Sequence, residues 1–230
     1  MEAIFFAGLG LIIGSFLNVL IFREGTEEGI GGRSHCQKCK HALSIADLVP
    51  VFSWLWLRGT CRYCTTPISA QYPLVELLSM VLFILVGMTT LPIGMLFVAC
   101  GVVAICIAVA VYDLRHLLMP DAWNYTFLAL AFIFGLQAVS SLGDVVFHIA
   151  AGIGTAFPLW MLWFMSNGAW MGYGDVKFSL GIGWLASITL LMTTKMVVTT
   201  KSSMRLKPFS PARVFTREVF RFRTELKTIW

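Results

Sequence analysis

Charged side chains are what this sequence lacks. They make up 13% of its 230 residues, whereas an average soluble protein has roughly one charged residue in four. Hydrophobic residues make up 58%, so too few polar side chains are present to cover a water-soluble globule. The composition therefore excludes an ordinary soluble domain and indicates a protein whose main solvent is lipid.

The alternating pattern of a membrane β-barrel is also absent, so the apolar segments are predicted to be helices, which satisfy their own backbone hydrogen bonds in lipid. A segment of about 17 to 25 apolar residues can cross a bilayer, and the sequence contains six. They are residues 3–22, two spans within 74–111 that are separated at 89–92, and residues 123–139, 145–165 and 176–198. The first span has no basic residues ahead of it and is predicted to be a retained signal anchor.

Basic residues mark one side of the predicted membrane domain. Six of them lie within residues 23–71, whereas the turns at 89–94 and 140–144 carry none. Short cytoplasmic loops are enriched in Lys and Arg. We therefore expect the amino terminus outside, and residues 23–71 in the cytoplasm together with the loops that hold Asp113 and Asp175.

The carboxyl-terminal tail departs from this pattern. Nine of the seventeen Lys and Arg residues lie at or beyond Lys195, on the side that six spans would place outside. Residues 213–230 have apolar side chains at helical spacing between basic ones, which is typical of an amphipathic helix on anionic headgroups. A solvated tail explains the same composition, and the sequence does not choose between the two.

Two CxxC pairs stand in the one substantial polar segment, between the first and second spans. They are Cys36 with Cys39 and Cys61 with Cys64, and 21 residues separate the pairs. This spacing is close to that of a four-thiolate zinc site, and so short a segment needs a metal because it cannot bury a sufficient core. Zinc is therefore predicted. The alternatives are free thiols and disulfides, which a reducing cytoplasm disfavours.

These features predict an all-α integral membrane protein with about six transmembrane helices and a small zinc-bound cytoplasmic domain between the first and second helices. Four regions follow along the chain. They are the first transmembrane helix (1–22), the four-cysteine zinc domain (23–72), the membrane core with both aspartates (73–199) and an atypical basic amphipathic tail (200–230).

Two aspartates stand out, because acidic residues near membrane depth are costly unless they are paired or used. Asp113 ends the apolar run of the third span, and Asp175 directly precedes the last span in the sequence Met171-Gly-Tyr-Gly-Asp175. Gly172 and Gly174 lack side chains, so the backbone there can approach a substrate chain closely. Both carboxylates are therefore expected to converge at the cytoplasmic face.

Two neighbouring carboxylates cannot both ionise easily, so one keeps its proton while the other acts as a base. Such a pair hydrolyses a peptide bond without a metal. The charged member takes a proton from water, and the neutral member protonates the carbonyl oxygen or the leaving amine. The alternative is a structural role, in which each carboxylate ends a helix and is balanced by Arg115 or Lys177. The residues alone do not separate the two interpretations.

Several further short sequence motifs occur together with the two aspartate motifs. They include Gly14-Ser-Phe-Leu-Asn-Val19, Asp47-Leu-Val-Pro50, Leu57-Arg-Gly59, Pro67-Ile-Ser69 and Tyr72-Pro-Leu-Val-Glu-Leu77. Together they resemble the bacterial type IV prepilin peptidases, the type IV leader peptidase and N-methyltransferase family of GxGD aspartyl membrane proteases. The resemblance implies that Asp113 and Asp175 are catalytic, and that Lys177 belongs with the glycines to a substrate-side loop.

The resemblance also implies substrates, cofactors and a location. Family members cleave the basic leader of type IV pilins and type II secretion pseudopilins at the cytoplasmic face of the bacterial inner membrane. Those with the four-cysteine domain also methylate the new amino terminus with S-adenosylmethionine. Prepilin and pseudopilin precursors and membrane lipids are therefore the expected partners, and nucleic acid is not. Glu76 is either a ligand for the substrate amine or a carboxylate at a helix amino terminus.

The end of the chain departs from the family, whose members usually continue with two or three more apolar spans where this sequence has its basic tail. Such a loss would keep the two aspartates but remove packing around them. Two other functions are therefore alternatives. One is an inactive protein that binds pilins during assembly, and the other is a proton-coupled transporter, which the position of the aspartates at helix ends disfavours.

Overall fold

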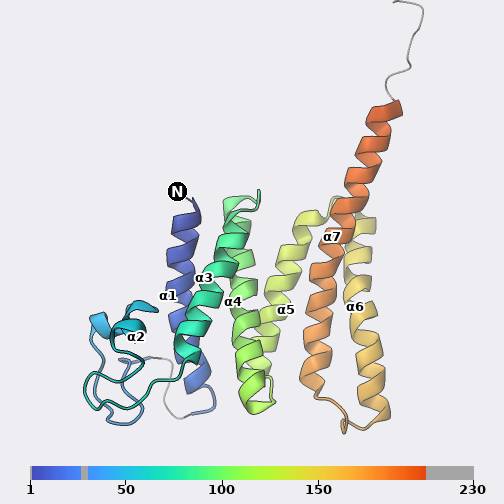
Figure 1. Cartoon of the computed structure of the whole chain (residues 1–230). Coiled ribbons are helices and arrows are strands. Elements are labelled where there is room, and N and C mark those ends of the chain that lie inside the picture. Colours follow the sequence, from blue (N-terminus) through green and yellow to red (C-terminus); the bar gives the residue numbers. More distant parts are fainter. Residues whose placement is uncertain (1, 27–30, 206–230) are drawn as a thin grey trace, which may run out of the picture. The chain divides into compact units, whose positions relative to one another are not determined.

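The computed structural model describes residues 2–26 and 31–205, with side chains described to Thr194. This part of the chain is helical apart from its loops, and its only β-type pairings are two isolated bridges. The helices are α1 (Glu2–Arg23), the 3-10 helix η1 (Ile45–Leu48), α2 (Phe52–Trp56), α3 (Gln71–Gly87), α4 (Ile93–His116), α5 (Asp121–Gly135), the 3-10 helix η2 (Leu136–Ala138), α6 (Leu142–Met165) and α7 (Tyr173–Arg205) (Figure 1).

Six of these helices, α1 and α3 to α7, occupy the six predicted spans. Four of them are long and apolar enough to cross a membrane, namely α1, α4, α6 and α7 as far as Thr194. Helices α3 and α5 have 17 and 15 residues. At about 1.5 Å per residue, 15 residues cover about 22 Å, less than a hydrocarbon core of roughly 30 Å. The predicted all-α membrane fold is confirmed, with two of its six helices shorter than a full span.

The chain separates into two compact units, residues 1–188 and 189–230. The first holds α1 to α6 and the beginning of α7. In the second, α7 continues past Lys195 to Arg205, so the predicted boundary between residues 199 and 200 falls inside a helix. The amphipathic helix predicted at 213–230 lies outside the described residues.

Helices α1 and α3 pack with their backbones in contact, because glycines of α1 face α3. A Cβ atom on Gly14 would lie 2.7 Å from the Cα atom of Glu76, and one on Gly10 would meet the α3 backbone as closely. Small residues permit such an approach between membrane helices. The buried Asn18 donates hydrogen bonds to the carbonyl oxygens of Gly14 and Tyr72, both at 3.2 Å. Helix α1 therefore fixes the start of α3.

Helix α4 lies between α3 and α5 and is the most buried of the four candidate spans (Figure 1). Its side chains join those of α1, α3 and α5 in one apolar cluster. The buried members are Leu17, Ile21, Val75, Val102, Ile105, Ile107, Ala108, Val109, Trp123, Phe127 and Ala131. Burial of this apolar surface holds the end of α4 that carries Asp113.

The first part of α7 packs against α5 and α6 through small residues. Gly181 lies against the Phe127 ring of α5, and Gly183 lies against α6 at the carbonyl of Ala151. The buried His148 of α6 and Ser187 of α7 are joined by a hydrogen bond of 2.5 Å. These contacts place the beginning of α7 firmly on its two neighbours.

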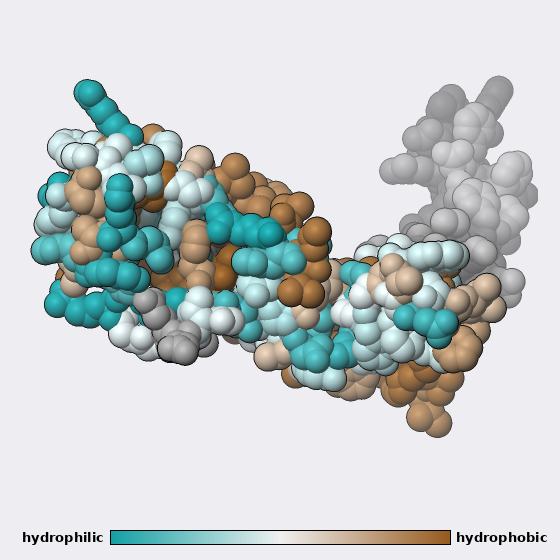
Figure 2. All heavy atoms as spheres, turned by 90° about the horizontal axis from the view of Figure 1, so that it is seen from below, coloured by the Kyte–Doolittle hydropathy of each residue, from teal (hydrophilic) through white to brown (hydrophobic). Residues whose placement is uncertain are grey.

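The loops after α1, α4 and α6 lie at one end of the first unit. Near the end of α4, the Arg115 guanidinium lies 4.6 Å from the centroid of the Phe22 ring of α1. Lys177, near the start of α7, forms an ion pair with Asp121 at the start of α5. Figure 2 views this end and shows hydrophilic residues gathered on it. The four-cysteine segment and both candidate aspartates therefore share one end of the helices.

Candidate functional site

Asp113 lies half-buried in the last turn of α4. Its carbonyl oxygen accepts a 2.8 Å hydrogen bond from the N–H of Leu117. Leu117 takes a left-handed conformation with a φ of 52°, which ends the helix, and α5 begins directly after Pro120. This turn keeps the Asp113 side chain at the polar end of the helix core.

Asp175 lies half-buried in the first turn of α7, and its N–H donates to the carbonyl oxygen of Gly172 at 3.2 Å. A Cβ atom on Gly174 would lie 3.0 Å from Cβ of Met119 and 3.3 Å from the amide nitrogen of Asn124. A Cβ atom on Gly172 would make only an ordinary contact of 3.8 Å with the Asp175 carboxylate. Close packing therefore requires glycine at 174 and not at 172.

The segment from Met119 to Asn124 connects the surroundings of the two aspartates. It follows Asp113 closely in the chain, and it packs against Gly174, the residue before Asp175. Within the described ranges, the two carboxylates form no hydrogen bond with each other. Catalytic hydrogen bonds often tighten only when substrate is bound, so this separation is compatible with a working pair.

The two basic residues that the sequence offers as counter-charges have other partners. Lys177 Nζ lies 2.6 Å from Oδ1 of Asp121 and 4.8 Å from the Tyr125 ring centroid, and Arg115 lies over Phe22. Among the residues described, neither cation forms an ion pair with a candidate aspartate. A purely structural role for the aspartates would need these counter-charges, which are engaged elsewhere. Lys177 instead joins the start of α7 to α5.

Sequence reasoning missed Asn124, which is fully buried near the start of α5. Its amide nitrogen and oxygen both have no hydrogen-bond partner in the described part of the chain. Leaving such a group unsatisfied costs roughly 1 to 3 kcal/mol. The side chain lies beside Gly174, so a substrate backbone is a suitable partner for it. A lone amide in an otherwise apolar helix was the available signal.

Two turns of the same form hold the four cysteines. In each turn the N–H of the first cysteine donates to the carbonyl oxygen five residues later, at 3.0 Å for Cys36 and 2.8 Å for Cys61. The residue four positions after that cysteine has a positive φ, which is 56° at Lys40 and 55° at Thr65. The repeated turn brings both pairs of thiols to a shared centre.

The geometry of this centre fits a metal ion. The four Sγ atoms lie within 4.8 Å of one another, and those of Cys36 and Cys64 are 3.7 Å apart. A tetrahedral zinc with Zn–S bonds of about 2.3 Å places its sulfurs about 3.8 Å apart. Hydrogen bonds from the hydroxyl and N–H of Thr66 lower the pKa of Cys64 to about 6, which favours the thiolate that binds metals. The cysteines are free thiols rather than disulfides, so the four-cysteine cluster could hold a metal ion.

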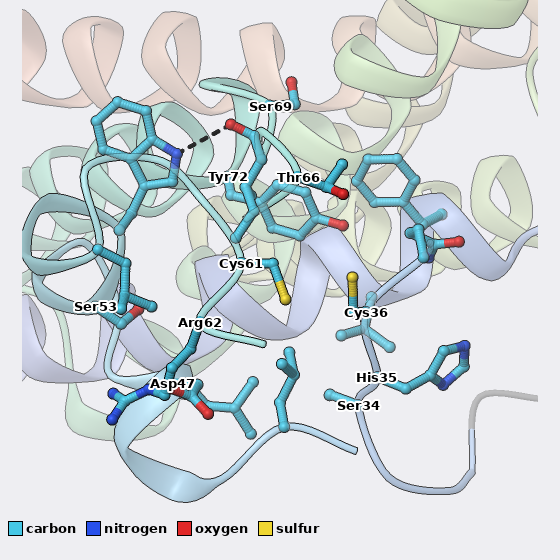
Figure 3. A pocket seen from close by; sticks show the side chains of 18 of the residues that line it. Ser34, His35, Cys36, Asp47, Ser53, Cys61, Arg62, Thr66, Ser69 and Tyr72 are labelled. Carbon is cyan, nitrogen blue, oxygen red and sulfur yellow. Dashed lines mark hydrogen bonds and ion pairs between the residues drawn. The ribbon is translucent and has the colours of Figure 1, made fainter. Parts of the chain in front are cut away.

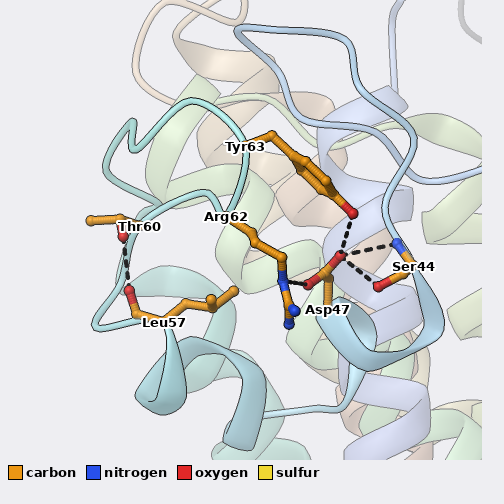
Figure 4. A network of polar contacts seen from close by, with 6 residues as sticks. All are labelled: Ser44, Asp47, Leu57, Thr60, Arg62 and Tyr63. Carbon is orange, nitrogen blue, oxygen red and sulfur yellow. Dashed lines mark hydrogen bonds and ion pairs between the residues drawn. The ribbon is translucent and has the colours of Figure 1, made fainter.

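An ion pair with a buried carboxylate joins the segment between the two turns to the second turn (Figure 4). Arg62 Nε lies 2.7 Å from Oδ1 of Asp47, whose Oδ2 accepts hydrogen bonds from the N–H and hydroxyl of Ser44 at 3.1 and 2.7 Å. Burial opposes the charge on Asp47, but the Ser44 hydrogen bonds and the Arg62 charge outweigh it and hold the pKa below its ordinary value. The rings of His41 and Tyr63 also join the two turns, with centroids 3.7 Å apart.

Glu76 connects the four-cysteine domain to α3. Its side chain is buried, Oε2 accepts a 2.7 Å hydrogen bond from the N–H of Val51, and the Ser15 hydroxyl of α1 is a second partner. Val51 has a φ of 63°, which is strained for a β-branched residue. Glu76 lies beyond the first turn of α3, so its interpretation as a helix amino-terminal carboxylate is wrong. Its hydrogen bond to Val51 holds the four-cysteine domain against α3.

A cavity of about 300 Å³ lies where α1, the four-cysteine domain and the start of α3 meet (Figure 3). Its lining includes the aromatic side chains of Phe22, Trp54 and Tyr72, and the carboxylates of Asp47 and Glu76. Small-molecule sites have volumes from roughly 300 Å³ upward. The size and composition of the cavity therefore suit a small ligand.

Two family models match the sequence one after the other. Residues 9–90 match the bacterial peptidase A24 N-terminal domain, and residues 100–200 match the type IV leader peptidase family. The first match includes the four-cysteine cluster and Glu76, and the second includes both candidate aspartates.

Curated relatives are similar over most of the chain. A prepilin leader peptidase/N-methyltransferase of Pectobacterium carotovorum subsp. carotovorum is 35% identical in an alignment of length 205, which covers 77% of this chain and 72% of the relative. A protein of the same name from Aeromonas hydrophila is 35% identical in an alignment of length 218, which covers 81% of this chain and 75% of the relative. A type 4 prepilin-like proteins leader peptide-processing enzyme of Escherichia coli O78:H11 is 32% identical in an alignment of length 204, which covers 79% of this chain and 76% of the relative. No solved structure matches the chain.

Proposed function

The chain belongs to the type IV leader peptidase family, and on that basis we propose that it is a membrane aspartyl endopeptidase. It removes the leader peptide of type IV prepilins and pseudopilins at the cytoplasmic face of the bacterial inner membrane. One observation carries the assignment of the site. The segments of Asp113 and Asp175 meet at one end of the helices, and the nearby cations Arg115 and Lys177 are engaged elsewhere.

In the proposed reaction the two aspartates share one proton, because two neighbouring carboxylates cannot both ionise easily. The ionised aspartate takes a proton from a water molecule as that water attacks the carbonyl carbon of the scissile bond. The protonated aspartate donates to the carbonyl oxygen, which gives a tetrahedral diol. As the C–N bond breaks, the aspartate that took the water proton gives it to the leaving amine, and the diol returns a proton to the other aspartate. The reaction consumes one water and needs no metal at this site.

Gly174 and Asn124 are proposed to hold the substrate chain beside the aspartates. The absent side chain at Gly174 lets Met119 and Asn124 pack beside the residue before Asp175, and the unpartnered amide of Asn124 offers N–H donors and a carbonyl acceptor. An extended peptide presents the complementary pair, a C=O and an N–H. These contacts would position the scissile bond without taking part in proton transfer.

The cleavage assay tests this proposal directly. The purified full-length chain in detergent is incubated with a pilin precursor, and the loss of mass equal to the leader is followed in time. Asp113→Asn and Asp175→Asn should each lower the rate by about 10²- to 10⁴-fold, the usual contribution of a positioned acid or base. Asp144→Asn is the matched control, because Asp144 Oδ2 accepts hydrogen bonds from the N–H groups of Ser140 and Ser141 at the start of α6, and the amide oxygen of asparagine can accept them too.

Helix content and metal content should be unchanged in all three variants. Cleavage at the normal rate by either Asp113→Asn or Asp175→Asn would refute the catalytic assignment. Wild-type protein that binds the precursor without shortening it would support the alternative of an inactive assembly protein.

The relatives' names also favour a second activity, N-methylation of the newly exposed amino terminus. S-adenosylmethionine is its proposed methyl donor, and the four cysteines are proposed to hold a structural zinc ion, which their Sγ geometry supports. Metal analysis should find one zinc per chain. Mature pilin from the reaction with the donor should gain the mass of one methyl group.

A further inference from the structure

We propose that the cavity between the four-cysteine domain, α1 and α3 binds the methyl donor, and that Glu76 holds its cationic centre and accepts the proton of the pilin amine. This inference rests on the proposed N-methyltransferase activity. It names the site and the charged group of that activity, neither of which sequence spacing could place.

The aromatic walls of the cavity are held rigidly. The Trp54 indole N–H donates to the carbonyl oxygen of Ile68 at 3.2 Å (Figure 3), and a Cβ atom on Gly59 would lie 2.9 Å from the indole ring. Phe22 and Tyr72 stack with centroids 5.0 Å apart. Nucleobases stack favourably on aromatic side chains, and fixed rings lose little entropy when they bind one. The walls therefore suit the adenine of an adenosyl compound.

The cavity is lined by charges of both signs, since Arg23, Lys38 and Arg62 line it together with Asp47 and Glu76, and Glu76 is the group in it that suits a cationic centre. Asp47 is neutralised by Arg62, but both hydrogen-bond partners of Glu76, Val51 and Ser15, are neutral groups. Glu76 is only 5% exposed, and no Lys or Arg forms an ion pair with it within residues 2–26 and 31–194. A buried carboxylate is costly without a compensating charge. The sulfonium of the donor and the ammonium of the acceptor both supply that charge.

The cavity also lies next to the end of α4. Phe22 in its wall contacts the Arg115 guanidinium, which is in the same last turn as Asp113. The neighbouring Tyr112 hydroxyl lies 3.8 Å from the position of a Cβ atom on Gly25, just after α1. An amino terminus released beside Asp113 would therefore have a short path to Glu76.

S-adenosylmethionine, when bound, supplies a methyl group on a positively charged sulfur. The Glu76 carboxylate takes a proton from the pilin α-ammonium, which leaves a neutral amine. The amine lone pair forms the new N–C bond as the S–C bond breaks, and the electron pair of that bond goes to sulfur. The products are a methylated ammonium, a neutral thioether and protonated Glu76, which returns its proton to solvent.

Equilibrium dialysis of the full-length chain in detergent with radiolabelled S-adenosylmethionine tests the site by binding alone. Glu76→Gln should weaken binding at least tenfold, because the amide keeps an acceptor for the Val51 N–H but carries no charge. Glu24→Gln is the matched control, since Glu24 lies just after α1 and does not line the cavity. Leader cleavage should be unchanged in both variants.

A second variant fills the space instead of removing the charge. Val19 lines the cavity from α1, so Val19→Trp should abolish donor binding while zinc content and leader cleavage persist. Unchanged binding in both Glu76→Gln and Val19→Trp would overturn the proposed site and leave the methyltransferase activity standing. Wild-type protein that cleaves prepilin but binds no donor would overturn the inference together with that activity.

Discussion

The four-cysteine domain and the aspartate region lie at the same end of the helices, yet they differ in whether their buried polar groups have partners. In the domain, Asp47 is paired with Arg62 and the thiols converge on one centre. Around the aspartates, the buried amide of Asn124 has no partner among the described residues, and the nearby cations are engaged elsewhere. Satisfied polar groups stabilise a fold, whereas an unsatisfied one in a native structure needs an explanation, of which a bound ligand is one. The first region satisfies its charged groups internally, and the second leaves an amide that the proposed substrate would satisfy.

Among changes that test this contrast, removing one cysteine of the four-cysteine cluster should cause the largest loss of stability. Structural zinc supplies about 10 to 16 kcal/mol of folding free energy in small zinc peptides, more than the core of so short a segment. Cys61→Ser should therefore release the zinc and make residues 34–70 sensitive to protease, as followed by metal analysis and limited proteolysis. Cys106→Ala, in the apolar part of α4, should keep both properties. A protease-resistant, metal-free Cys61→Ser protein would show that the domain folds on its own core.

The second largest effect is expected at Gly174. Gly174→Val places new atoms against Met119 and Asn124, where a Cβ atom alone would already lie 3.0 and 3.3 Å from its neighbours. Shifting the start of α7 displaces Asp175, and a misplacement of about 1 Å costs roughly 100-fold in rate. The cleavage rate of Gly174→Val should fall by about that factor. Gly172→Ala, which has room for its methyl group, should cleave nearly as fast as the wild type, and an equal loss in both would contradict the steric argument.

Asn124→Leu sharpens the contrast between the two regions. Replacing an unpartnered buried amide with an apolar side chain of similar size should leave the free energy of unfolding unchanged or raise it by about 1 kcal/mol. Leader cleavage should nevertheless fall about tenfold through a higher KM, because a contact to the substrate backbone is lost. The matched change in the other region, Asp47→Leu, should destabilise the four-cysteine domain, because it leaves Arg62 without its partner. An unfolded Asn124→Leu protein would mean that the amide stabilises the fold.

The smallest effect is expected at the Lys177–Asp121 ion pair. The side chain of Asp121 is 68% exposed, and pairs of this kind contribute about 0 to 1 kcal/mol. Lys177→Met should lower the free energy of unfolding by no more than that, and it should slow cleavage only a few-fold by loosening the start of α7. Asp121→Asn should have the same effect, and the double variant should be no worse than either single one. Additive losses would show that the two residues act separately.

Local sequence signals predicted the parts of this protein that depend on spacing. The four cysteines were identified because ligand spacing sets the cluster, and the helices were found because apolar runs define spans. Contacts between distant segments could not be predicted in this way. The partner of Lys177 proved to be Asp121, and the clamp from Glu76 to Val51 needs the strained turn before α2. The catalytic roles of the two aspartates stay predictions, supported by their placement at one end of the helices.

The pairing of α1 with α3 has a consequence for biosynthesis. Asn18 in α1 reaches a carbonyl acceptor at Tyr72, yet α3 begins at Gln71, 48 residues after α1 ends at Arg23. At about 5 to 20 residues per second, roughly 2 to 10 s pass before that acceptor is made. Until then the Asn18 amide nitrogen has the Gly14 carbonyl oxygen of its own helix as acceptor, and the glycine face of α1 is uncovered in the bilayer. Arrival of α3 supplies the second acceptor and covers the glycines, and it also joins the two ends of the four-cysteine segment while α4 to α7 are still being translated.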